Sequence, residues 1–213
     1  FFSSRRRHTR YGTVTGVQTC ALPILKREDL QPVFSFKNRG AYNKIFNLSD
    51  SEKRKGVIAA SAGNHAQGVA NACKKLKISC LIVMPITTPE IKIKAVKSFG
   101  AKIILHGDNY DAAVKHATSL AKKKKLSFIH PFDDPLTIAG QGTIGKEILD
   151  DKNDFDAVFV PVGGGGLLAG VAAWIAQNKK SIKIRRINYI FLRVTKHLIQ
   201  EGSALNDGIQ GYR

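Results

Sequence analysis

Ala157-Val-Phe-Val-Pro-Val-Gly-Gly-Gly-Gly-Leu167 begins with apolar, mostly β-branched residues, continues with four glycines, and leads into a helix-forming run. This order predicts a buried strand that turns tightly into a helix. Four adjacent glycines allow the backbone to approach a ligand closely, and the free N–H groups at a helix start favour an anion. The segment therefore predicts a phosphate-binding loop at residues 163–166, although a flexible turn is the structural alternative.

The same alternation of strand and helix runs from Leu25 to Ile184. The predicted strands are 56–61, 79–85, 102–106, 126–130, 157–162 and 181–184, and the predicted helices are 65–76, 89–99, 109–124, 137–149 and 167–177. We expect Thr88 to cap the second of these helices, with Pro89 at its first position and Gly100 past its end. Alternating strands and helices indicate an α/β fold with parallel sheets covered on both faces.

The composition indicates a globular protein. Of the 213 residues, 43% are hydrophobic and 23% are charged, which is enough apolar material for a core in one or two domains. The three cysteines, Cys20, Cys73 and Cys80, show neither a disulfide framework nor the spacing of a metal site. We therefore expect a reducing compartment, the cytoplasm, and no structural metal.

The formal net charge of +18 raises the question of a nucleic-acid partner. However, the most concentrated basic run, Lys122 to Lys125, lies at the end of a predicted helix. Cations there complement the helix dipole, so a solvated helix end explains the run. We expect no nucleic acid.

Three other interpretations of the glycine-rich regions fit less well. A dinucleotide fingerprint requires an acidic residue about twenty positions on, and residues 183–186 are mostly basic. A nucleotide P-loop at residues 140–146 lacks its Ser or Thr, because Glu147 stands there. Residues 157–176 are long enough to span a membrane, but Pro161 and the glycines indicate a strand and a loop, so we expect no membrane span.

The two ends of the chain do not continue the alternating pattern. Residues 1–24 read like a translated sequencing adapter, and we leave them out of the fold prediction. After Ile184 the alternation stops, and we expect residues 185–213 to be a frameshifted tail. A genomic reading frame that runs unbroken through both ends would contradict both expectations.

Two further segments are candidates for chemistry. Ser61-Ala62-Gly63-Asn64-His65 joins a strand to a helix, so its N–H groups favour a small anion such as a carboxylate, although an ordinary helix cap also explains it. Ser35 to Ala41 opens a predicted helix, with Ser35 as its cap. It contains Lys37, which spacing alone does not distinguish from the other lysines.

Together these segments resemble the threonine ammonia-lyase (threonine dehydratase) family of pyridoxal-phosphate (PLP) enzymes, and its biosynthetic branch in particular. The resemblance extends over residues 25–184 in unbroken order. The matching segments are Leu25-Lys-Arg-Glu-Asp-Leu-Gln-Pro-Val33, Ser35-Phe-Lys-Asn-Arg-Gly-Ala-Tyr42, Ala60-Ser-Ala-Gly-Asn-His-Ala-Gln-Gly68, Ile82-Val-Met-Pro85, His130-Pro-Phe-Asp133, Ile138-Ala-Gly-Gln-Gly142 and Val160-Pro-Val-Gly-Gly-Gly-Gly-Leu167.

The resemblance implies a role for each matching position. Lys37 matches the lysine that binds pyridoxal 5'-phosphate covalently, Phe36 an aromatic ring beside the cofactor, and Asn64 a contact to the pyridoxal 3′-oxygen. The implied phosphate cradle is Gly163, Gly164, Gly165, Gly166 and Leu167. The implied loop for the substrate carboxylate is Ser61, Ala62, Gly63, Asn64 and His65.

The resemblance also implies the architecture and the reaction. The family has PLP fold type II, with two open, twisted parallel sheets covered by helices; the small domain corresponds to about residues 38–130, and an incomplete large domain to 25–37 and 131–184. The implied reaction converts L-threonine to 2-oxobutanoate and ammonia, for isoleucine biosynthesis, in a homo-oligomer whose partner is the small amino-acid substrate. Serine dehydratase, serine racemase and an inactive fragment are the alternatives. Because the family extends beyond Ile184, we expect the 213-residue chain itself to be inactive.

Overall fold

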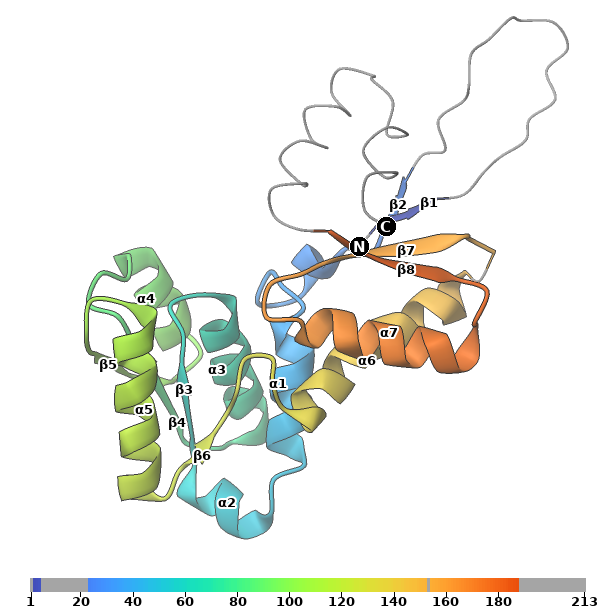
Figure 1. Ribbon diagram of the computed structural model, residues 1–213. Helices are drawn as coiled ribbons and strands as arrows, with labels where there is room; N and C mark the ends of the chain where they lie inside the picture. Colours follow the sequence, from blue (N-terminus) through green and yellow to red (C-terminus); the bar gives the residue numbers. More distant parts are fainter. Residues whose placement is uncertain (1, 5–22, 153, 188–213) are drawn as a thin grey trace, which may run out of the picture.

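The computed structural model describes residues 2–4, 23–152 and 154–187, which form two lobes, each with its own sheet (Figure 1). Strands and helices alternate along both lobes, which confirms the predicted α/β class. Most of the predicted adapter segment, and the predicted frameshifted tail beyond Ile187, lie outside the described residues.

The small lobe contains a parallel four-stranded sheet in the order β5-β4-β3-β6. Its strands are β3 (Val57–Ala60), β4 (Cys80–Met84), β5 (Lys102–Leu105) and β6 (Ser127–Phe128), and its helices are α2 (Asp50–Lys55), α3 (Asn64–Leu76), α4 (Glu90–Lys97) and α5 (Tyr110–Lys124). All four residues of β3 are buried, because helices cover both faces of this sheet.

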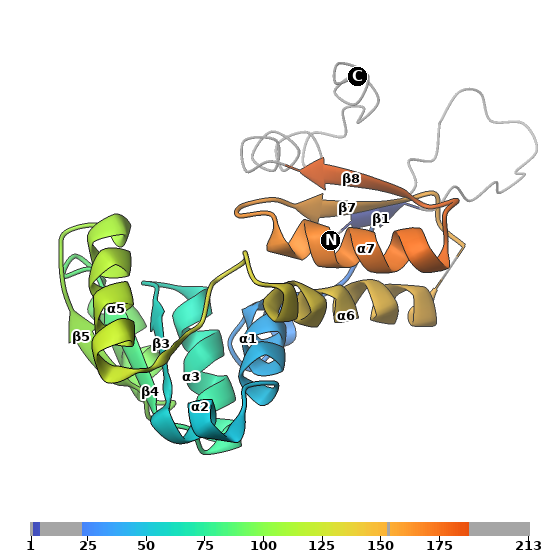
Figure 2. The ribbon, with the colours of Figure 1, turned by 60° about the horizontal axis from the view of Figure 1, so that its bottom comes forward.

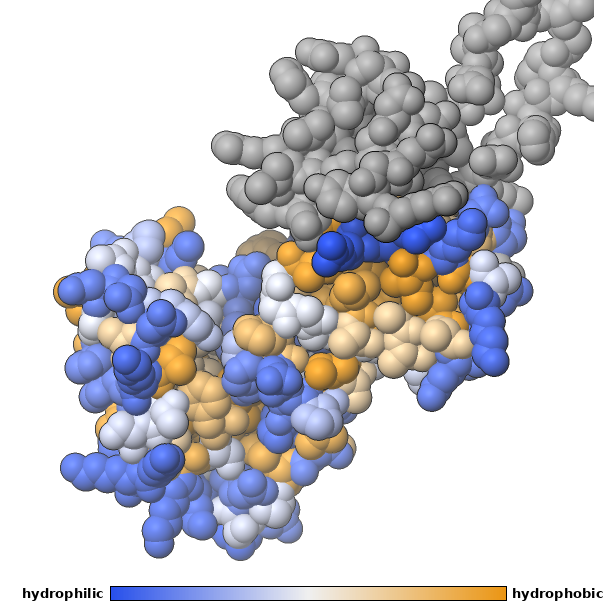
Figure 3. Space-filling view, in the orientation of Figure 1, coloured by the Kyte–Doolittle hydropathy of each residue, from blue (hydrophilic) through white to orange (hydrophobic). Residues whose placement is uncertain are grey.

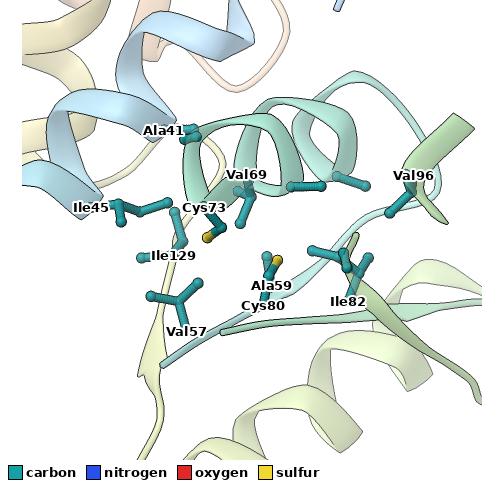
Figure 4. Close-up of a cluster of buried hydrophobic side chains, with 14 of the residues drawn as sticks. Ala41, Ile45, Val57, Ala59, Val69, Cys73, Cys80, Ile82, Val96 and Ile129 are labelled. Atoms are coloured by element: carbon teal, nitrogen blue, oxygen red, sulfur yellow. The ribbon is translucent and has the colours of Figure 1, made fainter. Parts of the chain in front are cut away.

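Two clusters of apolar side chains hold this lobe together. Val57 and Ala59 of β3 belong to a cluster that includes residues of α1 (Lys37–Phe46) and α3 (Figure 4), whereas the alternate residues Ile58 and Ala60 belong to a cluster with α5. The two cysteines that the structure describes, Cys73 and Cys80, are buried in the first cluster and are not disulfide-bonded. The strand period of two therefore divides the core between the two faces of the sheet.

The large lobe contains a sheet in the order β2-β1-β7-β8. Its elements are β1 (Phe2–Ser4), β2 (Pro23–Leu25), α6 (Pro135–Asp151), β7 (Ala157–Pro161), α7 (Gly166–Asn178) and β8 (Lys183–Ile187). β7 and β8 are parallel, as predicted, whereas β1 pairs antiparallel with both β2 and β7. This antiparallel pairing was not foreseen, because the residues of β1 had been left out of the fold prediction.

Helix α1 connects the two lobes, because it packs on α3 of the small lobe and on α6 of the large lobe (Figures 1 and 2). A Cβ on Gly68 of α3 would lie 2.9 Å from the carbonyl of Lys37, and a Cβ on Gly140 of α6 would lie 2.7 Å from Gly40. The 3-10 turn η1 (Glu28–Leu30) precedes α1 in the chain. Glycines at the helix crossings therefore bring the start of α1 close to both lobes.

The helix ends show where local prediction succeeded. The lysine run at 122–125 lies at the end of α5, as predicted, and Asn109, predicted as the first residue of this helix, is its N-cap. The prediction for α4 was wrong by one residue: Pro89 has an extended ψ of 140°, so it is itself the N-cap, and the buried hydroxyl of Thr88 has no hydrogen-bond partner. The capping box of Ser49 and Glu52 at the start of α2 was missed.

The uncharged stretch 157–176 is a strand, a loop and part of α7, as predicted, rather than one continuous helix. Hydrophobic residues gather on the surface of the large lobe where α7 lies, while hydrophilic residues cover much of the small lobe (Figure 3). Trp174 of α7 is 36% exposed. Within the described residues, no helix has the length and hydropathy needed to cross a membrane.

The crossing of α6 and α7 leads to a prediction about stability. A Cβ on Gly170 would lie 2.7 Å from the backbone nitrogen of Gly142, and would also meet the carbonyl oxygen of Ile138. Alanine favours a helix over glycine by about 1 kcal/mol. However, the atoms that the new Cβ would meet belong to the backbone, so they cannot move away by a change of side-chain rotamer. We expect Gly170→Ala to lower the free energy of unfolding by about 1 to 3 kcal/mol in urea titrations.

Gly163→Ala is the matched control for this measurement, because its Cβ would meet nothing within 4 Å. We expect it to leave the free energy of unfolding nearly unchanged. A gain of stability in Gly170→Ala would show that α6 and α7 separate easily, which would contradict the tight packing inferred here.

Candidate active site

A cavity of about 270 Å³ lies where α1, the 131–132 segment and the loop between β7 and α7 meet. This volume is close to the lower end of ligand pockets, about 300 Å³. Its lining residues are Phe36, Lys37, Pro131, Phe132, Gln141, Pro161, Val162, Gly163, Gly164, Gly165, Gly166, Leu167 and Ile187. The structure thus brings the predicted lysine and the predicted phosphate loop into one pocket, although they are 126 residues apart in the chain.

Lys37 is the first residue of α1, and its side chain is half-buried in this pocket. Its amine nitrogen Nζ donates a hydrogen bond of 2.6 Å to the carbonyl oxygen of Pro131 and lies 5.3 Å from the centre of the Phe36 ring. Burial disfavours the charged ammonium form and lowers the pKa of Lys37. The amine is therefore closer to a neutral nucleophile than a surface lysine would be.

The backbone N–H of Lys37 is hydrogen-bonded within its own segment. The hydroxyl oxygen of Ser35 accepts a 3.3 Å hydrogen bond from the N–H of Lys37, although the N-cap position itself belongs to Phe36. The prediction that Ser35 is the N-cap was therefore wrong by one residue, although its hydroxyl still supports the first turn.

The four glycines divide into two pairs. A Cβ on Gly166 would lie 2.5 Å from the carbonyl oxygen of Phe132, and a Cβ on Gly164 would meet the Phe132 ring. By contrast, a Cβ on Gly163 or Gly165 would meet nothing within 4 Å, and Gly165 has a φ of +86° that favours glycine. One pair therefore accommodates Phe132, and the other leaves open space where the loop enters α7.

The Ser61–His65 loop lies at the carboxyl end of β3, as predicted, but none of its residues lines the cavity. Asn64 begins α3 and is exposed, and the hydroxyl oxygen of Ser61 accepts a 3.1 Å hydrogen bond from the N–H of Gly63. His65 is buried, with its Nε2 2.9 Å from the carbonyl oxygen of Ile129. The roles implied for Asn64 and for this loop stay predictions.

Several pocket residues were not predicted as site residues. Pro131, Phe132 and Gln141 belong to two segments, 130–133 and 138–142, that carried the family resemblance without a role. That resemblance was the available signal for them. Val162 also lies in a matching segment, 160–167, whereas Ile187 offered no signal, because it is an ordinary apolar residue at the end of β8.

A network of charges fixes the position of α1 next to this pocket. The Arg39 guanidinium donates to both carboxylate oxygens of Glu28, at 2.7 and 2.8 Å, and to both of Glu147, at 2.5 and 2.8 Å. Burial opposes the charge of Arg39, but these hydrogen bonds outweigh it and raise its pKa. Paired forks of this kind fix orientation, so they lock α1 to η1 and α6.

A buried amine beside a glycine loop at a helix N-terminus defines the class of site: a pocket for a phosphorylated carbonyl compound in an α/β enzyme. The sequence model of the family described as "Pyridoxal-phosphate dependent enzyme" matches residues 17–201. The chain belongs to this family of PLP-dependent enzymes.

The residues of the pocket fit this cofactor. The open faces of Gly163 and Gly165 provide room for a phosphate next to the N-terminus of α7, and Lys37 presents its amine to the same cavity. Among the described residues, no group of three or more His, Cys, Asp or Glu side chains is placed to hold a metal ion.

Threonine dehydratases from several organisms are similar to this chain. The chain is 58% identical over 160 residues to "Threonine dehydratase" of Nicotiana attenuata and 58% identical to "L-threonine dehydratase biosynthetic IlvA" of Haemophilus influenzae. Each alignment covers 75% of this chain, and 27% and 31% of the relative, respectively. The chain therefore spans less than a third of the length of these relatives.

Solved structures of a threonine deaminase and a serine racemase have a similar fold. The processed form of threonine deaminase isoform 2 from Solanum lycopersicum matches with a TM-score of 0.76 and 52% identity, covering 84% of this chain and 49% of that one. Serine racemase from Dictyostelium discoideum matches with a TM-score of 0.73 and 34% identity, covering 83% and 58%. These matches confirm the predicted PLP fold type II.

The Arg39 network predicts how stability depends on pH. Hydrogen bonds from Arg39 lower the pKa of Glu147 to about 2, although its partial burial opposes this shift. The ordinary value is 4.5, so the ionised carboxylate stabilises the folded state above about pH 4.5, and this contribution is lost as the pH falls towards 2. We expect Glu147→Gln to be less stable than the original chain at pH 6 and to show a shallower loss of stability below pH 4.5.

The measurement is urea denaturation at a series of pH values. Parallel curves for the two proteins would mean that the Arg39–Glu147 pair does not contribute to the acid sensitivity of the fold.

Proposed function

We propose that this chain contains the cofactor-binding centre of a threonine ammonia-lyase, with Lys37 as the lysine that binds PLP covalently. The observation that supports this most directly is the buried amine of Lys37 in one pocket with the glycine loop 163–166. The names of the relatives support the choice of threonine. Because the chain spans less than a third of those relatives, the activity is proposed for the whole protein.

The proposed cofactor contacts follow from the pocket. The loop from Gly163 to Leu167, at the N-terminus of α7, would hold the phosphate through its N–H groups. The Phe36 ring, next to Lys37 Nζ, would form an apolar wall. Asn64 would contact the pyridoxal 3′-oxygen, which requires the small lobe to present the start of α3 to the cofactor.

Lys37 would act both as nucleophile and as base. Its lowered pKa leaves more of the amine neutral, so it can attack a carbonyl carbon and later remove the α-proton of threonine. Bound PLP supplies an electron sink for the negative charge that develops at the α-carbon. The carbonyl oxygen of Pro131 would orient the free amine, because it accepts the hydrogen bond from Nζ.

The Ser61–His65 loop would receive the substrate carboxylate. Its residues lead into the N-terminus of α3, where unpaired N–H groups and the helix dipole favour a negative charge. Loss of the β-hydroxyl and hydrolysis would then give 2-oxobutanoate and ammonia.

A serine-specific enzyme is the second candidate, because the structures similar to this chain include serine racemases from Dictyostelium discoideum and maize, each 34% identical. An inactive fragment is the third. The biosynthetic names of several relatives support a place in isoleucine biosynthesis. A cytoplasmic homo-oligomer, with a small domain at about 38–130 and residues 25–37 and 131–184 in the large domain, completes the proposal.

The first test is the attachment of PLP. We expect added PLP to give a visible absorbance band that borohydride fixes at Lys37, as mapped by mass spectrometry of peptides. Lys37→Ala should lose at least nine-tenths of this band, because no other lysine among the described residues lines the cavity. Lys55→Ala is the control, since Lys55 is exposed at the end of α2. Equal bands in Lys37→Ala and the original chain would rule out the assignment.

The second test is the choice of substrate. It uses the full reading frame of the gene, because the relatives are longer than this chain. We expect keto-acid release from threonine to exceed that from serine, with no racemisation of serine. Faster serine turnover, or racemisation, would favour the second candidate instead.

A further inference from the structure

We infer that His65 is a positioning residue, whose neutral imidazole donates its Nε2 proton to the carbonyl of Ile129 and so holds the segment 129–132 against Lys37. This inference rests on the proposed role of Lys37. The side chain of His65 would help to position Lys37. This role is separate from the proposed binding of a carboxylate by the backbone of the Ser61–His65 loop.

The tautomer follows from the hydrogen bond itself. The Nε2 atom of His65 lies 2.9 Å from the carbonyl oxygen of Ile129, which can only accept. Nε2 must therefore bear the proton. His65 is 4% exposed, so this hydrogen bond is shielded from water. A buried carbonyl that lost its donor would be costly to leave unpaired.

The groups that face His65 keep the ring neutral. Burial is the main cause that lowers its pKa to about 4, and two neighbouring basic groups, Lys37 on α1 and His130 on the segment, lower it further. The hydrogen bond to Ile129 opposes this shift without reversing it. Because the folded pKa lies below the ordinary value of 6.5, the ring stays neutral at and above neutral pH, where the lysine amine would act.

The segment 129–132 is held at its beginning by the small lobe. The N–H of Ile129 donates to the carbonyl oxygen of Ile58 in β3 at 2.9 Å, and its carbonyl accepts from His65. The next residue, His130, uses Nδ1 to accept from the N–H of Asp133 at 2.7 Å, which shapes the turn. The N–H and the carbonyl of Ile129 are therefore both hydrogen-bonded before the chain reaches the pocket.

The same segment then contacts the two proposed cofactor elements. The carbonyl oxygen of Pro131 accepts from Lys37 Nζ at 2.6 Å, and Phe132 packs on Gly164 and Gly166 of the glycine loop. A shift at Ile129 would therefore be transmitted, over two residues, to the acceptor that holds the amine. His65 is the side chain that prevents this shift, because it ties Ile129 to the rigid start of α3.

Loss of the His65 donor has a specific consequence for Lys37. If the segment relaxes, Pro131 no longer seals the amine from water, and hydration favours the ammonium form. The pKa of Lys37 should then rise towards its ordinary value. A general loss of stability elsewhere in the small lobe would not change the solvation of this amine.

The experiment compares three variants of the full chain. His65→Leu removes the donor, and His65→Gln retains a side-chain N–H that reaches a similar distance. Val69→Ala creates a cavity on the same helix, in the apolar cluster that also contains Ile129, but removes no hydrogen bond from that residue. Val69 is fully buried, so this control lowers stability by another route. The readout is the pH dependence of Lys37 acetylation by acetic anhydride, quantified by mass spectrometry with the exposed Lys55 as internal reference.

We expect His65→Leu to slow the acetylation of Lys37 at pH 8 by about three- to tenfold, because each unit of rise in pKa reduces the neutral amine about tenfold. His65→Gln should recover at least half of the original rate, and Val69→Ala should match the original profile. An unchanged profile in His65→Leu, or an equal shift in Val69→Ala, would overturn the inference.

A measurement on the unmodified chain covers the case in which His65→Leu does not fold. Long-range proton–nitrogen NMR should show His65 protonated at Nε2 alone from pH 5.5 to 8. A ring protonated at Nδ1, or one that titrates near pH 6.5, would refute the inference. Borohydride trapping of PLP on the unmodified chain separates the two proposals: without trapping at Lys37 the proposed function fails, whereas trapping with an unchanged His65→Leu profile refutes only the role of His65.

Discussion

Close backbone contact between helices determines how α1, α3, α6 and α7 pack around the pocket. At Gly68, Gly140 and Gly170 an added Cβ would lie within 3 Å of a backbone atom of a neighbouring helix. These contacts place α1 directly against α3 and α6, and α6 against α7. The start of α1 therefore lies at the junction of the lobes. There Lys37 faces the glycine loop 163–166, which follows β7 of the large lobe. Side chains of ordinary size at the crossings would separate these helices and enlarge the pocket.

Two cations two residues apart on α1 illustrate how environment decides the state of a charge. Arg39 is paired with two carboxylates by four short hydrogen bonds, so its charge is stabilised although its side chain is only 13% exposed. Among the described residues Lys37 has no carboxylate partner and donates to a carbonyl oxygen, so burial dominates and disfavours its charge. Breaking a buried pair commonly costs about 3 to 5 kcal/mol, which makes Arg39 a firm anchor for the helix. The anchor in turn keeps the neighbouring amine in its water-poor site.

The segment 129–132 couples these features into one site. It begins at β3, passes His65 and Lys37, and ends with Phe132 on the glycine loop, so it contacts both lobes within four residues. Positioning of a reacting group is worth a large part of a catalytic barrier, and such positioning requires rigid support. The structure supplies that support from the backbone and from a neutral histidine. A protonated imidazole at His65 would place a positive charge close to the amine of Lys37.

Local sequence determined most elements of this fold, because alternating apolar runs, caps and glycines act over a few residues. The strands β3, β4, β5 and β7 and the helices α3, α5 and α7 lie within a few residues of their predicted bounds. The resemblance to a known family then distinguished Lys37 from the other lysines. What only the tertiary structure decided is the set of long-range contacts: the antiparallel β1, the carbonyl of Pro131 at Lys37, the ring of Phe132 on Gly164, and the Arg39 network. These contacts join residues that are far apart in the chain, and no local pattern encodes which of many similar carbonyls or rings will meet a given side chain.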